Sequence, residues 1–305
     1  MRLLNASGCL DALTAPGAAR ELDAFVTKTV TPLAREGNPP ARIAETEVGM
    51  LNAIGLANPG IDAFVAEHLP RLAHLGVPVW VSVGGFSIDD YVLVSARFDG
   101  RAEVAALELN LSCPNVDEVP ENVGEVVTAV RGVTRKPLYA KLSAAVADLA
   151  ATARAAEAAG ADGLSLVNTV RGLALDESTL RPLLERGAGG LSGPALRPVA
   201  LAAVHTCFRE TRLPIVGMGG VATGRHALEL LAAGATDVAV GTALFADPGA
   251  ATRICSELEA ELGAHGFANP DNAVGAAHAP AEATLDPRSR VKVTKPLHTG
   301  AKLSG

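Results

Sequence analysis

Residues 214–242 read PIVGMGGVATGRHALELLAAGATDVAVGT and contain the pattern that sets the architecture. Short apolar runs over Pro214–Gly217 and Asp237–Val240 predict buried parallel strands. Between them, Gly224–Gly234 has the apolar spacing of a helix and ends at a glycine, the residue best suited to the left-handed position after a helix. A strand, a helix and a second strand in this order predict a parallel sheet with helical crossovers.

The same alternation extends over most of the chain. A further helix is predicted over Asp148–Gly160, and eight strands are predicted over Ala24–Val30, Gly49–Ile54, Val77–Val83, Ala105–Leu109, Pro137–Leu142, Gly163–Val167, Pro214–Gly217 and Asp237–Val240. Eight such strands indicate an α/β protein with a closed, single-domain (β/α)8 TIM barrel, whose usual size of ~250 residues suits residues 1–268. Residues 269–305 lose this periodicity, so we expect an irregular C-terminal tail, solvated or loosely docked rather than a strip for docking a partner.

Composition excludes several classes of function. The 305 residues include 26 basic and 33 acidic side chains, a net charge of −7, which argues against nucleic acid as the main partner. The four cysteines lie far apart, with neither metal-ligand spacing nor the density of a disulfide scaffold, so we expect a reducing cytoplasm and no metal site. No apolar run reaches ~18 residues, and we expect neither a membrane span nor an export signal.

A thiol and two carboxamides follow one predicted strand directly. The hexapeptide Asn110-Leu111-Ser112-Cys113-Pro114-Asn115 comes immediately after Ala105–Leu109. A cysteine there is placed to move a proton on a small polar heterocycle. A buried structural cysteine beside a proline turn is an equal alternative, because free cysteine usually packs as a small hydrophobe.

The other predicted strand ends are also polar, and in barrels the residues after the strands form the active site. Lys28, Asn52, Ser82, Lys141 and Asn168 all fall at such ends. The Gly219-Gly220 and Gly241-Thr242 turns expose backbone N–H groups and predict a phosphate site. Glycines that merely permit tight turns are the alternative.

Several stretches together resemble the class 1 dihydroorotate dehydrogenases, FMN enzymes of pyrimidine biosynthesis. They include Asn5-Ala6-Ser7-Gly8, Gly37-Asn38-Pro39, Asn52–Asn58, Ser112–Asn115 and Gly190–Pro194. Residues 45–56 and 189–194 are most similar to the 1B branch. That branch passes electrons to NAD through a second subunit that carries FAD and an iron-sulfur cluster. The resemblance thus implies oxidation of dihydroorotate to orotate by a homodimer at the core of a heterotetramer.

The resemblance also implies roles for individual residues. Cys113 would remove the C5 proton of dihydroorotate while a hydride leaves C6 for N5 of FMN, and Lys141 would lie beside N1 of the flavin. The residues implied to bind substrate are Lys28, Asn52, Ala53, Ile54, Gly55, Leu56, Asn110, Asn115, Asn168 and Thr169. Those implied to bind FMN are Ser7, Lys28, Thr29, Ser82, Asn110, Lys141, Val167, Gly193, Gly219, Gly220, Gly241 and Thr242.

Three departures from the family pattern keep a second hypothesis open. The N-terminal hairpin is expected to be missing, the link from Asn115 to Gly124 is short, and Ser82 stands where the family has asparagine. A divergent FMN-binding barrel that acts on another cyclic amide, or a non-catalytic flavoprotein, therefore remains an alternative. The residues of this chain do not distinguish NAD, fumarate and oxygen as the final electron acceptor.

Overall fold

Eight parallel strands form the barrel in the computed structural model, which describes residues 1–111 and 122–279. Their order around the sheet is β1 (Leu3–Asn5), β12 (Asp237–Val240), β11 (Ile215–Met218), β8 (Gly163–Leu166), β7 (Leu138–Leu142), β6 (Val104–Asn110), β5 (Val79–Val83) and β2 (Phe25–Val26). A parallel bridge between Leu4 and Ala24 joins β1 to β2 and closes the cylinder. The predicted (β/α)8 barrel is confirmed.

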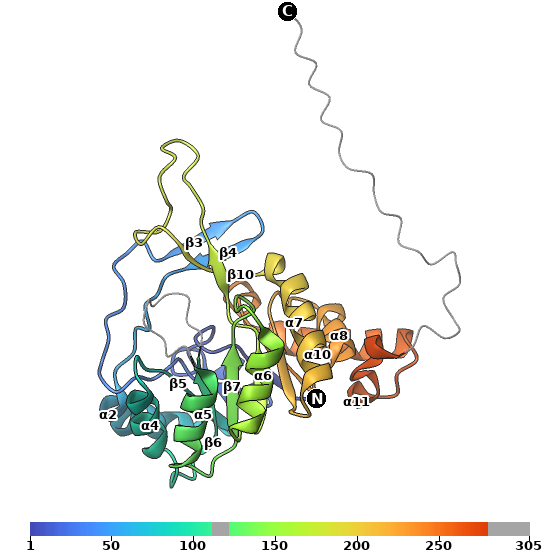
Figure 1. The fold of residues 1–305 in the computed structure, drawn as a ribbon. Coiled ribbons are helices and arrows are strands. Elements are labelled where there is room, and N and C mark those ends of the chain that lie inside the picture. Colours follow the sequence, from blue (N-terminus) through green and yellow to red (C-terminus); the bar gives the residue numbers. More distant parts are fainter. Residues whose placement is uncertain (112–121, 280–305) are drawn as a thin grey trace, which may run out of the picture.

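Helices cover the outside of the barrel (Figure 1). They are α1 (Pro16–Arg20), α2 (Ile61–Ala63), α3 (Leu69–Leu72), α4 (Ile88–Ala96), α5 (Val123–Arg131), α6 (Leu149–Ala158), α7 (Arg197–Glu210), α8 (Gly224–Ala233), α9 (Ala243–Ala246), α10 (Ala250–Ala264) and α11 (Pro270–Ala273). The two helices that the sequence predicted, α6 and α8, are both present. Their terminal backbone groups find hydrogen-bond partners or a suitable residue nearby in the sequence. Asp148 and Thr223 accept backbone hydrogen bonds at the starts of α6 and α8, and Gly234 ends α8 with φ +118°.

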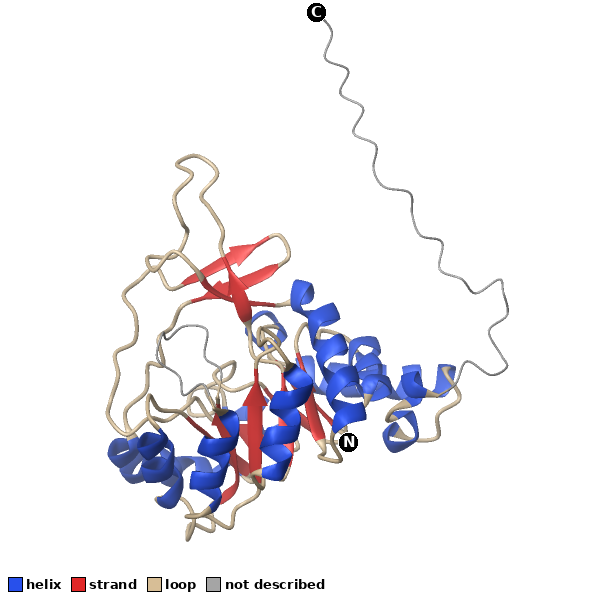
Figure 2. Ribbon diagram, in the orientation of Figure 1, coloured by secondary structure: helices blue, strands red, loops and turns tan. Residues whose placement is uncertain are grey.

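One predicted barrel strand is wrong. Gly49–Ile54 does not enter the barrel, because β4 (Gly49–Asn52) belongs to a separate antiparallel sheet of order β3 (Ile43–Thr46), β4, β10 (Gly189–Ser192) and β9 (Val170–Gly172). The eighth barrel strand is instead β1. Its three residues are buried, but a strand of this length is too short to be recognised as an apolar run. In Figure 2 the small sheet lies above the barrel, at the end where the barrel strands finish.

The interior of the barrel is packed at its other end. Trp80 and Tyr139 pack against each other with ring centroids 4.4 Å apart and an angle of 36° between the ring planes. The guanidinium of Arg2 lies 5.0 Å from the centre of the Trp80 ring and 2.7 Å from the Asp237 carboxylate. This cluster fills the end where the strands begin, so space for a ligand is left at the end where they finish.

Two segments lie outside the barrel. The stretch expected to be irregular is helical at its start: α11 and a 3₁₀ turn over Ala276–His278 pack on α8, and Gly275 N–H donates to Leu231 O at 2.9 Å.

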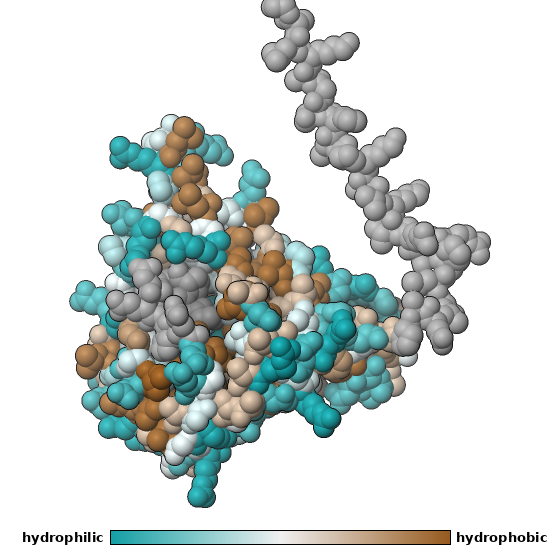
Figure 3. Space-filling model, viewed as in Figure 1, coloured by the Kyte–Doolittle hydropathy of each residue, from teal (hydrophilic) through white to brown (hydrophobic). Residues whose placement is uncertain are grey.

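The loop 173–188 protrudes beyond the small sheet (Figure 1), and the exposed fractions of Leu173 and Leu180 are 58% and 71%. Figure 3 shows apolar side chains exposed on this loop beside polar ones. No helix in the described residues has the length and apolar character needed to cross a bilayer.

Candidate active site

A cavity lies between the carboxyl ends of the barrel strands and the small sheet. Its volume is about 260 Å³, close to the lower end of the ~300–1,000 Å³ of typical ligand pockets. Most of the predicted site residues line it, namely Ser7, Lys28, Thr29, Asn52, Ile54, Leu56, Asn110, Lys141, Val167, Asn168, Thr169, Gly193, Gly219, Gly220, Gly241 and Thr242. Residues far apart in the sequence therefore meet at one place.

Three predicted residues do not line the cavity. Ser82 is fully buried, and its hydroxyl lies 3.0 Å from Thr29 Oγ1, so it supports a lining residue instead of facing a ligand. Ala53 is buried behind the small sheet, where its N–H donates to Arg42 O, and Gly55 approaches Asn38. Cys113 and Asn115 lie outside the described residues.

The cavity also has lining residues to which the sequence assigned no role: Ala6, Gly8, Cys9, Ile43, Met50, Ser192, Leu196, Met218, Val221 and Phe245. Most of them are apolar, so they could not be found by looking for polar side chains at the ends of predicted strands. Among these residues, Cys9 is of a type that can act as a base or a nucleophile. Burial raises the pKa of its thiol, and the positive charges of Lys141 and Lys28 offset this only in part. It is therefore a protonated thiol at neutral pH and a poor base.

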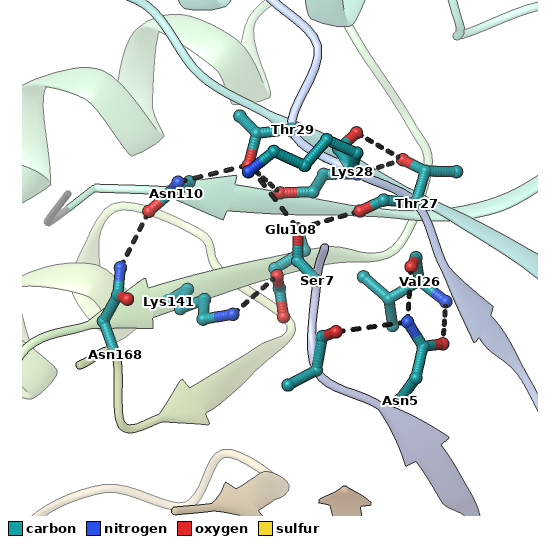
Figure 4. Close-up of polar contacts among 12 residues, drawn as sticks. Asn5, Ser7, Val26, Thr27, Lys28, Thr29, Glu108, Asn110, Lys141 and Asn168 are labelled. Atoms are coloured by element: carbon teal, nitrogen blue, oxygen red, sulfur yellow. Dashed lines mark hydrogen bonds and ion pairs between the residues drawn. The ribbon is translucent and has the colours of Figure 1, made fainter. Parts of the chain in front are cut away.

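A chain of hydrogen bonds fixes the carboxamides of the cavity wall (Figure 4). Asn168 Nδ2 donates to Asn110 Oδ1 at 3.0 Å, and Asn110 Nδ2 donates to Thr29 Oγ1 at 3.2 Å. Ser7 Oγ, 3.5 Å from Thr29 Oγ1, donates to Thr27 O at 2.8 Å. The side chains of β6 and of the turn after β8 are thus oriented before any ligand arrives, which suits recognition of a planar ring with fixed donors and acceptors.

Two lysines bring positive charge to the cavity. Lys28 follows β2, and its stem packs against Gly8, where a Cβ would come within 2.9 Å of Lys28 Cδ. Lys141 on β7 is 7% exposed, and its Nζ lies 3.3 Å from Oε1 of Glu108, which is 1% exposed. Glu108 was not among the predicted site residues, although a charge inside the apolar run Ala105–Leu109 is a visible signal.

Glycine turns form the opposite side of the cavity. Gly193, Gly219 and Gly220 have φ values of +95°, +129° and +70°, a region that other residues rarely adopt. The two turns touch, because a Cβ at Gly220 would lie 2.9 Å from Gly193 O and 3.0 Å from Arg197 N. A side chain would force the two turns apart, whereas glycine turns leave their backbone N–H groups accessible, as phosphate sites require. Lysines and amides on one side and glycine turns on the other are groups of the kind that hold a phosphorylated cofactor with a planar ring.

Comparison with known proteins gives one consistent result. The family model described as "Dihydroorotate dehydrogenase" matches residues 2–262. The "Dihydroorotate dehydrogenase B (NAD(+)), catalytic subunit" of Desulforudis audaxviator is 49% identical over 264 residues, which are 84% of this chain and 86% of that protein. Its counterpart from Geobacter sp. strain M21 is 46% identical over 262 residues, 84% and 86% of the two chains. The dihydroorotate dehydrogenase of Eimeria tenella in complex with ferulenol shares the fold at TM-score 0.78 and 24% identity, over 91% of this chain and 85% of that one.

Proposed function

The chain belongs to the dihydroorotate dehydrogenase family, and on that premise we propose that its cavity oxidises dihydroorotate to orotate in pyrimidine biosynthesis, with FMN as the bound cofactor. The observation that carries the proposal is the meeting of the glycine turns, two lysines and the Asn110–Asn168 pair in one cavity.

The glycine turns and one wall of the barrel would hold FMN. Gly193, Gly219, Gly220, Gly241 and Thr242 would bind its phosphate through backbone N–H groups. Ser7, Thr29, Val167, Asn110 and the two lysines would line its ring. When bound, FMN supplies the hydride acceptor, and the ammonium of Lys141 provides a counter-charge for the reduced ring.

The substrate would lie over the carboxamides. Lys28 would pair with the carboxylate of dihydroorotate, while Asn52, Asn110, Asn168 and Thr169 would match the donors and acceptors of the ring. Support for this placement comes from the fixed orientation of Asn110 and Asn168, whose amides are already linked at 3.0 Å. Ile54 and Leu56 add apolar surface from the segment after β4.

We assign the general base to Cys113 on the strength of its motif. It follows Asn110 by three residues, so the length of the chain alone keeps the two within ~11 Å. A thiol with an ordinary pKa of ~8.5 becomes a competent base near neutral pH after a modest shift. Its task is to take the C5 proton of the substrate.

Anaerobic reduction tests the proposed reaction. We expect the purified protein to be yellow, and dihydroorotate added without oxygen to bleach the flavin absorbance within one turnover, with one orotate formed per flavin. A protein that holds FMN but is not bleached by dihydroorotate would instead favour the divergent flavoprotein.

The role of Cys113 is tested by Cys113→Ser. We expect this variant to retain FMN and to be bleached by dihydroorotate at least ~100-fold more slowly at pH 7 in stopped-flow measurements, because a hydroxyl is a much weaker base than a thiolate. Cys255→Ser is the matched control, since Cys255 lies on α10 away from the cavity. Equal rates for the parent and Cys113→Ser would remove Cys113 from proton transfer.

We further infer a partner for the electrons. The relatives are named catalytic subunits of an NAD(+) enzyme, which supports a second subunit that carries FAD and an iron-sulfur cluster and meets a homodimer of this chain. Reduced protein should then transfer electrons to NAD only after that subunit is added. Direct reoxidation by fumarate at a comparable rate, with no response to NAD and the partner, would contradict this inference.

A further inference from the structure

Glu108 is a buried carboxylate inside the barrel to which the proposed function gives no task. It lies on β6 two residues before Asn110, and side chains two apart on a strand point to the same face. Its neighbours in register are Ser82 on β5 and Tyr139 on β7, both buried. Asn110 lines the cavity and Glu108 does not. Glu108 therefore lies one layer below the cavity wall.

The carboxylate forms an ion pair with Lys141 from this lower layer. Lys141 Nζ lies 3.3 Å from Glu108 Oε1, and the two side chains are 7% and 1% exposed (Figure 4). Desolvation of a buried ion pair offsets most of its attraction, so such a pair adds little stability compared with apolar side chains of the same size. Removal of one partner alone is strongly destabilising. Stability is thus a weak explanation for a carboxylate at this position.

Resting on the proposed function, we propose that Glu108 is a positioning residue that anchors the ammonium of Lys141 beneath the flavin and offsets part of its charge. The ion pair holds the end of a flexible four-carbon side chain at one point of the cavity wall. The carboxylate also weakens the positive field that Lys141 exerts on the ring. In a buried environment that screens charges poorly, this second effect is large enough to change the redox balance of the cofactor.

The charge effect has a definite sign. A negative charge near the ring disfavours the anionic reduced flavin relative to the neutral oxidised form. Glu108→Gln keeps an oxygen that accepts a hydrogen bond from Lys141 but removes the charge. We expect the ratio of FMN affinities, reduced over oxidised, to rise at least tenfold in this variant. That is a midpoint potential about 30 mV more positive for a two-electron couple.

A matched control is available at the other end of the barrel. Asp237 is also a buried carboxylate on a barrel strand and pairs with Arg2 at 2.7 Å, where the strands begin. Asp237→Asn removes the same charge away from the cavity. We expect its flavin potential, measured by anaerobic dye titration of the holoprotein, to match that of the parent. A Glu108→Gln potential equal to that of Asp237→Asn would overturn the charge effect and leave Glu108 a packing role only.

Thermal melting of the apoprotein tests the anchor without the cofactor. We expect Lys141→Met alone to lower the melting temperature more than the double variant Glu108→Gln/Lys141→Met, because the single change leaves a buried carboxylate unpaired. If the losses of melting temperature in the two single variants add up to the loss in the double variant, the two side chains are not coupled. That result would overturn the proposed anchor. A parent protein that binds no FMN would contradict the proposed function instead, and this cycle would still decide the coupling.

Discussion

Gly220 is a residue at which a side chain should damage the proposed phosphate cradle. A Cβ there would lie 2.8 Å from Arg197 Cβ and 2.9 Å from Gly193 O, so both turns of the cradle would have to separate. We expect Gly220→Ala to weaken FMN binding at least tenfold in a fluorescence titration, because the backbone N–H groups would no longer converge on one phosphate.

Gly187→Ala controls for backbone strain in this experiment. Gly187 has φ +78°, close to the +70° of Gly220, but a Cβ there would meet nothing within 4 Å. Both alanines therefore carry the left-handed penalty of ~1–2 kcal/mol, and only Gly220→Ala also collides with neighbours. Equal FMN affinities in the two variants would mean that the Gly193 and Gly220 turns do not hold the phosphate.

The sequence predicts individual residues well where a polar side chain ends a strand. Asn110, Lys141 and Asn168 were found by this rule, and all three line the cavity. Glu108 was missed because it lies inside a strand, and Phe245 because an apolar side chain after a turn looks like packing. The role of Ser82 differs because hydrogen bonding to Thr29, invisible in the sequence, turns it away from the cavity.

At the scale of elements, local pattern identifies strands but not their partners. The segment Gly49–Ile54 contains an apolar run like those of the barrel strands, yet its strand β4 pairs with β10, where Asn52 lies opposite Gly190. These residues are 138 positions apart, and no short window contains such a pairing. The β1 strand was missed for the opposite reason: three residues give too little pattern, and they form a strand because β12 pairs with them.

The C-terminal element is expected to be sensitive to pH. His278 stacks on His205 of α7 with ring centroids 4.0 Å apart, and its Nε2 lies 2.9 Å from Ala233 O. Burial, and then the nearby His278 and Arg209, lower the pKa of His205 below its usual 6.5. Protonation of His205 therefore favours the undocked state. The docking contribution is present above pH ~6.5 and is lost as the pH falls from there through the lowered pKa.

Hydrogen exchange of residues 270–278 measures this dependence. We expect their backbone protection to fall between pH 6.5 and 5 in the parent, and to remain in His205→Phe, which keeps an aromatic ring but cannot be protonated. His74→Phe is the control, because His74 is exposed on a different 3₁₀ turn, Ala73–Leu75. An unchanged pH response in His205→Phe would place the proton uptake elsewhere.

At the scale of the whole molecule, the cavity is where the two sheets meet. Its lining comes from residues that follow or end seven barrel strands and from β3, β4 and β10 of the small sheet. The architecture and the active end of the barrel were predictable, because they depend on the number and direction of local strands. The small sheet that covers this end was not predictable as a whole, since only its β3–β4 hairpin is local and β9 and β10 join it from far along the chain.

Because one ligand would contact both sheets, FMN should stabilise the molecule as a unit. Ligand at 100 times its dissociation constant adds ~2.7 kcal/mol to the free energy of unfolding. With an unfolding entropy of about 2.1 cal/mol/K per residue, this corresponds to a rise of about 4 °C in melting temperature for a chain of this size. Riboflavin, which lacks the phosphate, should raise the melting temperature of the apoprotein clearly less at equal concentration. The same rise with both ligands would mean that the glycine turns contribute nothing to binding, even if the flavin ring occupies the cavity.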